Sequence, residues 1–362
     1  MRFNPEKPYN ELPLLPPRAE IETKAVLKKL VTAGQYLAEL KGYVELLPNK
    51  AIILNAVTLQ EAKDSSEIEN IVTTNDQLFK AISASKTATD PSVKEVLNYR
   101  RALYKGFDLV RKHNLITANT IIEIQQELEQ NNAGIRKLPG TKLSNDRTGQ
   151  VMYTPPENEK TIRSLLANLE TYMNTDEGNV HPLIKLAIIH YQFESIHPFY
   201  DGNGRTGRII NVLYLVMKEL LTEPLLYLSR YIIDNKSDYY SLLRKVTTDN
   251  AWEDWICYML MAIEKTSDYT LALCKEIMTL MGNVRETLRD ELPKIYSHEL
   301  LEVLFTNVYT RTDHLVKNNI ASRNVAGRYL KELESLGILK SEKVGRDVFY
   351  INAGLVNLFK KP

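Results

Sequence analysis

Twelve consecutive residues near the middle of the chain concentrate the groups that phosphate chemistry needs. The segment His197–Arg208 reads HPFYDGNGRTGR and lies between two strongly apolar stretches. Polar groups placed between two buried helices are costly to desolvate unless they bind something. Glycines let backbone N–H groups converge on one point, and a helix start favours negative charge. The pattern therefore predicts an anion site cradled by Gly202, Asn203 and Gly204.

Charged residues in the same segment indicate that the anion is a polyphosphate. Arg205 and Arg208 are three residues apart, so both project from one side of a helix start and offer two guanidinium groups. Asp201 borders the cradle, where a carboxylate can hold Mg²⁺ against phosphate oxygens. His197 can accept a hydroxyl proton at neutral pH, because an unperturbed imidazole has a pKa of about 6.5.

Taken singly, an Asn-Gly pair or a histidine beside proline is usually a turn former or a packing residue. Taken together, the segment matches HPFxDGNGRxxR, the signature of the Fic (filamentation induced by cAMP) family, at every fixed position. The resemblance includes the preceding HYQFESI and covers roughly residues 10–350. It implies a Fic-type helical bundle that moves AMP from ATP to a Ser, Thr or Tyr hydroxyl of a protein and releases pyrophosphate.

The resemblance also assigns roles within the segment. His197 would be the base that acts on the target hydroxyl, and Asp201 would be the Mg²⁺ ligand. Arg205 and Arg208 would hold the β- and γ-phosphates. Gly204 stands where the Doc-like phosphotransferase branch has a lysine, which leaves the cradle open for AMP transfer. The remaining nucleotide-binding positions are Gly202, Asn203, Thr206 and Gly207.

A second motif lies closer to the N-terminus. Residues 65–70 read SSEIEN and fit [S/T]xxxE[G/N], the inhibitory motif of the Fic class with an N-terminal inhibitory helix. The pattern alone is weak, and an ordinary polar helix face is the alternative. Ser65 and Glu69 are four residues apart, hence on one helix face. We expect Glu69 to neutralise Arg208 and so misalign ATP; the resemblance adds that the same glutamate can support removal of AMP.

The rest of the chain is predicted to be mainly α-helical. Residues 141–143 and 151–153 flank turn-forming residues and predict a β-hairpin, which resembles the flap that pairs with target backbone; a purely structural hairpin is the alternative. Tyr240, in the pair Tyr239-Tyr240, is expected to offer an aromatic surface to adenine, with core packing as the alternative. Helical periodicity covers residues 21–47, 52–70, 93–113, 117–130, 161–173, 182–194, 206–221, 237–247 and 252–288.

The last part of the chain has a different pattern. Helices near residues 298–306, 312–317 and 323–336, the last capped by Ser322 and ended by Gly337, precede two strands at 338–344 and 347–351. This is the order of a winged helix-turn-helix. Residues 323–346 carry a net charge of +3, which suits a DNA backbone modestly. Winged helices also dock proteins, so both partners stay open.

Composition restricts the class of protein. The 362 residues are 44% hydrophobic and 25% charged with a net charge of +1, which excludes a disordered chain and a polycation. We expect three domains, at residues 1–92, 93–288 and 289–362. Cys257 and Cys274 cannot form a disulfide framework. Without an apolar leader or a membrane-length apolar run, a cytoplasmic location with no membrane contact is expected.

These observations favour one function and leave a rival. The preferred reading is a protein adenylyltransferase that uses ATP and Mg²⁺, is autoinhibited by Glu69, and modifies a target protein, itself included. The rival is a nucleotide-sensing transcriptional regulator whose winged helix binds DNA. The oligomeric state is open, with a homodimer as one alternative.

Overall fold

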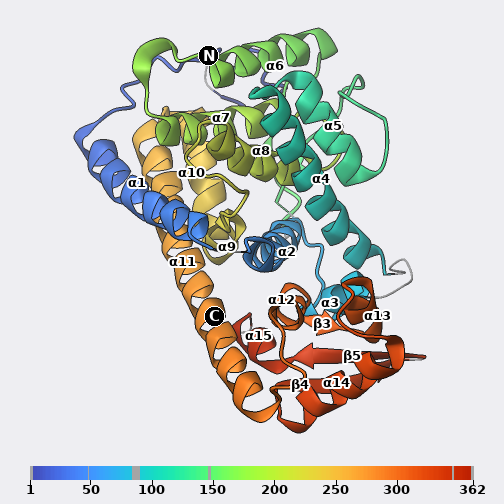
Figure 1. The fold of residues 1–362 in the computed structure, drawn as a ribbon. Coiled ribbons are helices and arrows are strands. Elements are labelled where there is room, and N and C mark those ends of the chain that lie inside the picture. The colour runs from blue at the N-terminus through green and yellow to red at the C-terminus, as the bar shows by residue number, and fades with distance from the viewer. Residues whose placement is uncertain (1–2, 48, 84–89, 146–147, 345, 360–362) are drawn as a thin grey trace. The chain divides into compact units, whose positions relative to one another are not determined.

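A computed structural model describes residues 3–47, 49–83, 90–145, 148–344 and 346–359 (Figure 1). The protein is mostly helical, as the periodicity predicted. The helices are α1 (Lys24–Glu45), α2 (Ala51–Ile68), α3 (Asn75–Ser83), α4 (Pro91–His113), α5 (Ala118–Glu129), α6 (Glu159–Asn174), α7 (Pro182–Ile196), α8 (Asn203–Met217), α9 (Leu228–Asp234), α10 (Lys236–Asp249), α11 (Trp252–Glu291), α12 (His298–Thr306), α13 (Thr312–Lys317), α14 (Arg323–Ser335) and α15 (Ala353–Leu358). The strands are β1 (Leu143–Ser144), β2 (Val151–Tyr153), β3 (Tyr309–Thr310), β4 (Leu339–Val344) and β5 (Asp347–Asn352).

The chain divides into two compact units that interleave along the sequence. Unit 1 contains residues 1–41, 58–71 and 95–268, and unit 2 contains residues 42–57, 72–94 and 269–362. The division into three consecutive domains, with boundaries after residues 92 and 288, stays a prediction. No helix in the described ranges is long and apolar enough to cross a membrane.

The core of unit 1 is built on α7 and α8, which pack against each other, with α6 against α7 and α5 against α8 (Figure 1). Almost every residue of α7 is buried, because its sequence is apolar on all sides. The one lysine within it, Lys185, is accommodated by its surroundings. Its ammonium donates to the carbonyl of Thr175 at 2.6 Å and lies 4.5 Å from the centre of the Tyr172 ring. A buried cation is therefore solvated by a carbonyl and an aromatic face.

The predicted hairpin is present in unit 1. Leu143 pairs with Tyr153 and Ser144 with Val151 in an antiparallel arrangement that contains an irregularity. Residues 146 and 147, in the turn of the predicted hairpin, lie outside the described residues. The strand β2 is anchored at its end, because the hydroxyl of Tyr153 donates to the carbonyl of Ser195 in α7 at 2.9 Å.

Unit 2 contains the predicted C-terminal helices and a small sheet. Three antiparallel strands lie in the order β3-β5-β4, with Lys340 opposite Ile351. Ser322 stands at the N-cap of α14 as expected, but its side chain makes no capping hydrogen bond. Gly337 follows α14 with a φ of 72°, a left-handed conformation that suits glycine. Gly345, at the predicted turn of the β-ribbon, lies outside the described residues.

Short elements were not predicted from the sequence. They are α3, α9, α15 and the two-residue strand β3. In unit 2, α3 packs on β3: the rings of Phe79 and Tyr309 are 5.5 Å apart, and the Tyr309 hydroxyl donates to Asp76 at 2.7 Å. Residues 83–92 read SASKTATDPS, a small and polar composition typical of a linker, and residues 84–89 lie outside the described ranges.

Candidate active site

The segment His197–Arg208 forms the turn between α7 and α8 and the first turns of α8, all within unit 1. His197 is the C-cap of α7, with φ 48° and ψ 60°, and Gly202 precedes α8 with a φ of 77°. Asn203 locks the turn through its amide: Oδ1 accepts from the backbone N–H of Phe199 and Nδ2 donates to the Phe199 carbonyl, both at 2.9 Å. The oxygen and the nitrogen of the Asn203 side chain are thus both hydrogen-bonded within the turn.

The imidazole of His197 is half-buried and neutral at physiological pH. Burial and the positive charge of Arg136 lower its pKa to about 4, although Glu69, Asp201 and the backbone carbonyl of Glu194 act in the opposite direction. A neutral imidazole has a free electron pair with which it can accept a proton. His197 is therefore unprotonated at neutral pH, as a general base must be.

Arg208 is buried, with its side chain 1% exposed, and it binds Ser65 and Glu69. Its Nε donates to the Ser65 hydroxyl at 2.8 Å, and Nη2 donates to the Ser65 carbonyl at 2.8 Å and to Glu69 Oε1 at 2.7 Å. Burial alone would raise the pKa of Glu69, but the charge and hydrogen bond of Arg208 lower it below its ordinary value. The ion pair predicted between Glu69 and Arg208 is thus present.

The sequence predicted that Glu69 lies on a helix over residues 52–70, but in the structure Glu69 lies in the turn that follows α2. The helix α2 stops at Ile68, and Asn70 adopts a φ of 63°, the left-handed conformation in which asparagine commonly terminates helices. The end of α2 is held by Lys236, whose ammonium donates to the Ile68 carbonyl at 2.6 Å. This turn brings the Glu69 carboxylate over the start of α8.

Gly204 shows how closely this carboxylate approaches α8. A Cβ atom at Gly204 would collide with Glu69 Oε1 and lie 3.0 Å from Nη1 of Arg208. The glycine therefore provides the space in which the carboxylate sits. An anionic group occupies the helix start, where backbone N–H groups favour negative charge.

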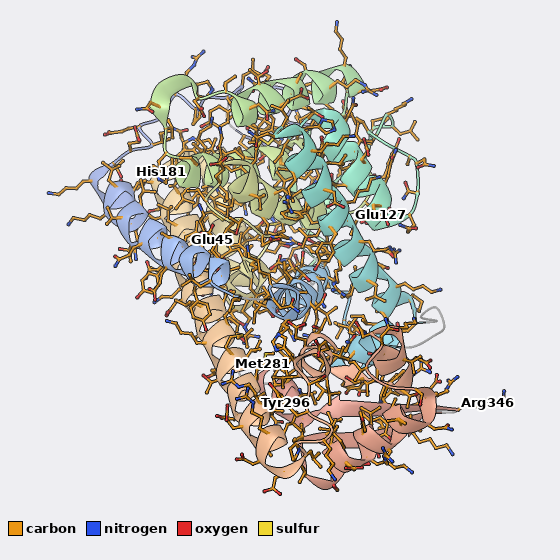
Figure 2. All side chains as sticks on the ribbon, in the orientation of Figure 1. Glu45, Glu127, His181, Met281, Tyr296 and Arg346 are labelled. Carbon is orange, nitrogen blue, oxygen red and sulfur yellow. The ribbon has the colours of Figure 1, made fainter. Side chains whose placement is uncertain are left out.

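Arg205 binds a different set of carboxylates. Its Nη1 donates to Glu95 at 2.9 Å and its Nη2 to Glu129 at 2.8 Å, while Asp201 lies 3.9 Å from Nη2. Glu127, labelled in Figure 2, marks the end of α5 that carries Glu129. The two arginines of the segment thus face separate acidic groups, and sequence reasoning identified neither Glu95 nor Glu129.

The other predicted site residues lie in different surroundings. Thr206 is fully buried, and Gly207 packs against α7, where a Cβ would meet Phe193 at 3.0 Å and collide with Glu194. Tyr240 is 46% exposed and packs edge-on against the buried Tyr239, with ring centres 5.0 Å apart. Tyr240 therefore presents an aromatic surface to solvent, while Gly207 lets α8 pack closely against α7.

Asp201 is the one acidic residue of the segment His197–Arg208, and its side chain is 79% exposed. One of its oxygens, Oδ1, accepts from the backbone N–H of Gly202 at 2.6 Å. Within the described residues, no three His, Cys, Asp or Glu side chains gather into a group that could hold a metal ion alone. A single exposed carboxylate fits Mg²⁺ that takes its other ligands from phosphates and water.

The buried face of α2 carries two acidic residues, Glu61 and Asp64, that precede the motif at residues 65–70. Glu61 accepts hydrogen bonds from the Tyr99 hydroxyl at 3.0 Å and from the Ser229 N–H at 2.9 Å, and the Tyr227 hydroxyl donates to Asp64. Burial raises the pKa of Glu61 to about 7, although these hydrogen bonds oppose the shift. The part of α2 that precedes residues 65–70 is therefore fixed to α4 and to the start of α9 by polar contacts.

Sequence models of known families match three parts of the chain. The sequence model of the Fic/DOC family matches residues 115–215, its N-terminal counterpart matches residues 27–108, and a C-terminal domain described for SoFic-like protein adenylyltransferases matches residues 280–355. The chain belongs to the Fic/DOC family. Its relatives include a protein adenylyltransferase Fic of Nematostella vectensis, 26% identical over 62% of this chain and 51% of the relative. A probable protein adenylyltransferase of Aquifex aeolicus is 28% identical over 53% of this chain and 56% of the relative.

Solved structures of the family share the fold. A Fic family protein from Desulfovibrio desulfuricans G20 covers 93% of this chain, and this chain covers 98% of it, with a TM-score of 0.59 at 18% identity. Fic-1 from C. elegans (residues 134–508) covers 69% of this chain, and 74% of that protein is covered, with a TM-score of 0.54. The chain spans about half the length of the curated relatives it matches.

Proposed function

We propose that this Fic protein is a protein adenylyltransferase that moves AMP from ATP to a hydroxyl side chain of a protein. The observation that carries the proposal is the start of α8, where a glycine-lined anion site adjoins a neutral histidine. Its relatives named protein adenylyltransferases support the same activity. Target proteins, including the enzyme itself, are the partners that this activity requires.

The reaction needs one proton acceptor and one anion site. His197 accepts the proton of the target hydroxyl, whose oxygen attacks the α-phosphorus of ATP. A bond forms between that oxygen and the α-phosphorus. The bond between the α-phosphorus and the oxygen that bridges to the β-phosphate breaks, and pyrophosphate leaves. Gly202, Gly204 and the start of α8 offer N–H groups to the phosphates, and Arg205 and Arg208 supply positive charge once their carboxylate partners give way.

Asp201 is the residue that would hold Mg²⁺. Its carboxylate is exposed beside the anion site, as a ligand shared between the protein and a nucleotide must be. The ion, when bound, neutralises charge on the phosphates of ATP and the departing pyrophosphate.

We further propose that the enzyme is autoinhibited. The Glu69 carboxylate occupies the space above Gly204 and neutralises Arg208, so the terminal phosphate of ATP and Glu69 compete for one guanidinium. A nucleotide bound without Arg208 would have its α-phosphate displaced, and a displacement of about 1 Å is enough to slow transfer by about 10²-fold. Removal of AMP, supported by the same glutamate, is a second activity compatible with this position.

Substrate-binding roles follow from the surface elements of unit 1. The hairpin of β1 and β2 is proposed as the flap that pairs with target backbone, and Tyr240 as the surface against which adenine stacks. We propose that unit 2 ends in a winged-helix module, with a protein or DNA as its partner. The cytoplasmic location and a homodimer stay predictions from the sequence.

Parallel incubation with α-labelled and γ-labelled ATP tests the activity. Adenylyl transfer leaves α-label on protein, and the label disappears in His197→Ala but persists in His298→Ala, an exposed histidine of α12. Retained γ-label would instead indicate phosphotransfer. Absence of either label, together with sequence-specific DNA retention, would favour the regulator.

A further inference from the structure

A buried arginine outside every sequence motif contacts the turn that carries His197. Arg136 lies between α5 and β1, is fully buried, and its backbone N–H donates to the Pro198 carbonyl at 2.9 Å. Its Nε donates to the His197 carbonyl at 2.7 Å. Its Nη2 donates to the carbonyl of Pro156 and, at 3.4 Å, to that of Ile196. One side chain thus serves three carbonyl oxygens.

Two of these carbonyls belong to the C-terminus of α7. The last carbonyls of a helix have no partner within the helix, and a cation at that end is favoured by the helix dipole. His197 also has a φ of 48°, a conformation in which a residue with a side chain is disfavoured and must be held by its surroundings. The guanidinium of Arg136 provides this restraint.

The third carbonyl connects the same guanidinium to the hairpin. Pro156 follows β2 by three residues, so the chain leaving the hairpin is fixed to the side chain that fixes His197. A flap that carries the target hydroxyl and a base that deprotonates it must keep a constant separation during transfer. Arg136 donates hydrogen bonds to the backbone of both the chain that leaves the hairpin and the turn that carries His197.

We propose that Arg136 is a positioning residue for adenylyl transfer: it closes the end of α7, fixes His197 in its left-handed conformation, and ties the exit of the hairpin to that turn. The proposal rests on the proposed role of His197 as the base. It adds a residue that touches neither nucleotide nor target.

The charge of Arg136 has a second consequence for His197. The groups that face the imidazole are Arg136, which disfavours its protonation, and Glu69, Asp201 and the Glu194 carbonyl, which favour it. Burial acts in the same direction as Arg136. Removal of the positive charge should therefore move the titration of His197 toward the ordinary range, whereas Arg136→Lys, which keeps the charge, should not.

NMR titration of the six histidines in the full chain tests this without measuring activity. His197→Gln identifies the His197 signal. We expect the His197 ring of the wild-type protein to show no titration midpoint between about pH 5.5 and 8, whereas in Arg136→Gln the midpoint rises from its wild-type value toward this window. Arg136→Lys, which keeps the charge, should leave the window empty. Arg163→Gln, at an exposed arginine of α6, is the matched control.

Kinetics test the positioning role in a Glu69→Gly background. Arg136→Lys should lower kcat by about tenfold and leave the KM for ATP within about twofold, because one ammonium cannot serve three carbonyls and a small displacement of the base slows transfer. Full kcat in Arg136→Lys, or a wild-type His197 that titrates near pH 6.5, overturns the proposal even if Arg136→Gln fails to fold. If no chain transfers AMP, the proposed function fails, and the titration still decides whether Arg136 controls His197.

Discussion

Glu69 Oε1 and Arg208 Nη2 lie 2.7 Å apart although 139 residues separate them in the chain. The arginine is buried in the first turns of α8, whereas the glutamate ends α2 and is about one-third exposed. Together with the hydrogen bonds from Arg208 to Ser65, this ion pair joins residues 65–69 to the start of α8. Protonation or substitution of Glu69 would therefore remove the negative charge that faces Arg208.

The stability that this ion pair provides should depend on pH. The pKa of Glu69 is lowered in the folded protein, so the contribution of its carboxylate is present at pH 7 and is lost as the pH falls through the folded-state pKa. We expect Glu69→Gln to reduce the free energy of unfolding by about 1 kcal/mol at pH 7, a value discounted for partial exposure, and by progressively less as the pH falls through the lowered folded-state pKa of Glu69. Urea unfolding at several pH values measures this difference.

The control for this series is Glu67→Gln. Glu67 is on the same segment and pairs with Lys63 at the surface, so its replacement should change stability by a few tenths of a kcal/mol. Equal losses for the two variants at pH 7 would contradict a specific role for the pair of Glu69 and Arg208.

Gly204 should be coupled to Glu69. In the wild-type chain, Gly204→Ala places a methyl group against the Glu69 carboxylate and should cost about 1–2 kcal/mol of stability. In a Glu69→Gly background the collision is absent, and alanine in a helix should then stabilise the protein by up to about 1 kcal/mol. Thermal unfolding of the four chains gives the coupling energy. Additive effects would show that the carboxylate does not occupy this space in solution.

Divalent metal dependence should be traceable to Asp201. We expect chelation to abolish labelling by α-labelled ATP, and Asp201→Asn to raise the Mg²⁺ concentration for half-maximal rate by about tenfold or more. Because Asp201 is highly exposed, its replacement should leave the unfolding temperature nearly unchanged. Asp176→Asn, at an exposed aspartate paired with Lys218, is the control and should not alter the Mg²⁺ requirement.

Long elements and the motif turn were predictable because their signals are local. The apolar run of α7, the glycines before α8, and the ribbon of β4 and β5 each have a pattern that a short stretch of sequence determines. The pairing of Glu69 with Arg208 was predictable only through the family resemblance. Its distance along the chain leaves no local trace.

The acidic partners of Arg205 and the contacts of Arg136 could not be predicted in the same way. Glu95 and Glu129 lie on helices with many charged residues, and nothing in their spacing separates them from solvated neighbours. Arg136 precedes the hairpin in a polar stretch that reads as a surface loop, yet it is buried. Only the packing of α4, α5 and α7 around the start of α8 selects these residues.

The most direct measurement is the rate of α-label incorporation from ATP in four chains: wild type, Glu69→Gly, Glu67→Gly and Glu69→Gly with His197→Ala. We predict that Glu69→Gly incorporates label about 10²-fold faster than wild type, that Glu67→Gly does not, and that the added His197→Ala abolishes the gain. A Glu69→Gly chain that labels no faster than wild type would contradict autoinhibition through Arg208. Label that persists without His197 would contradict its role as the base.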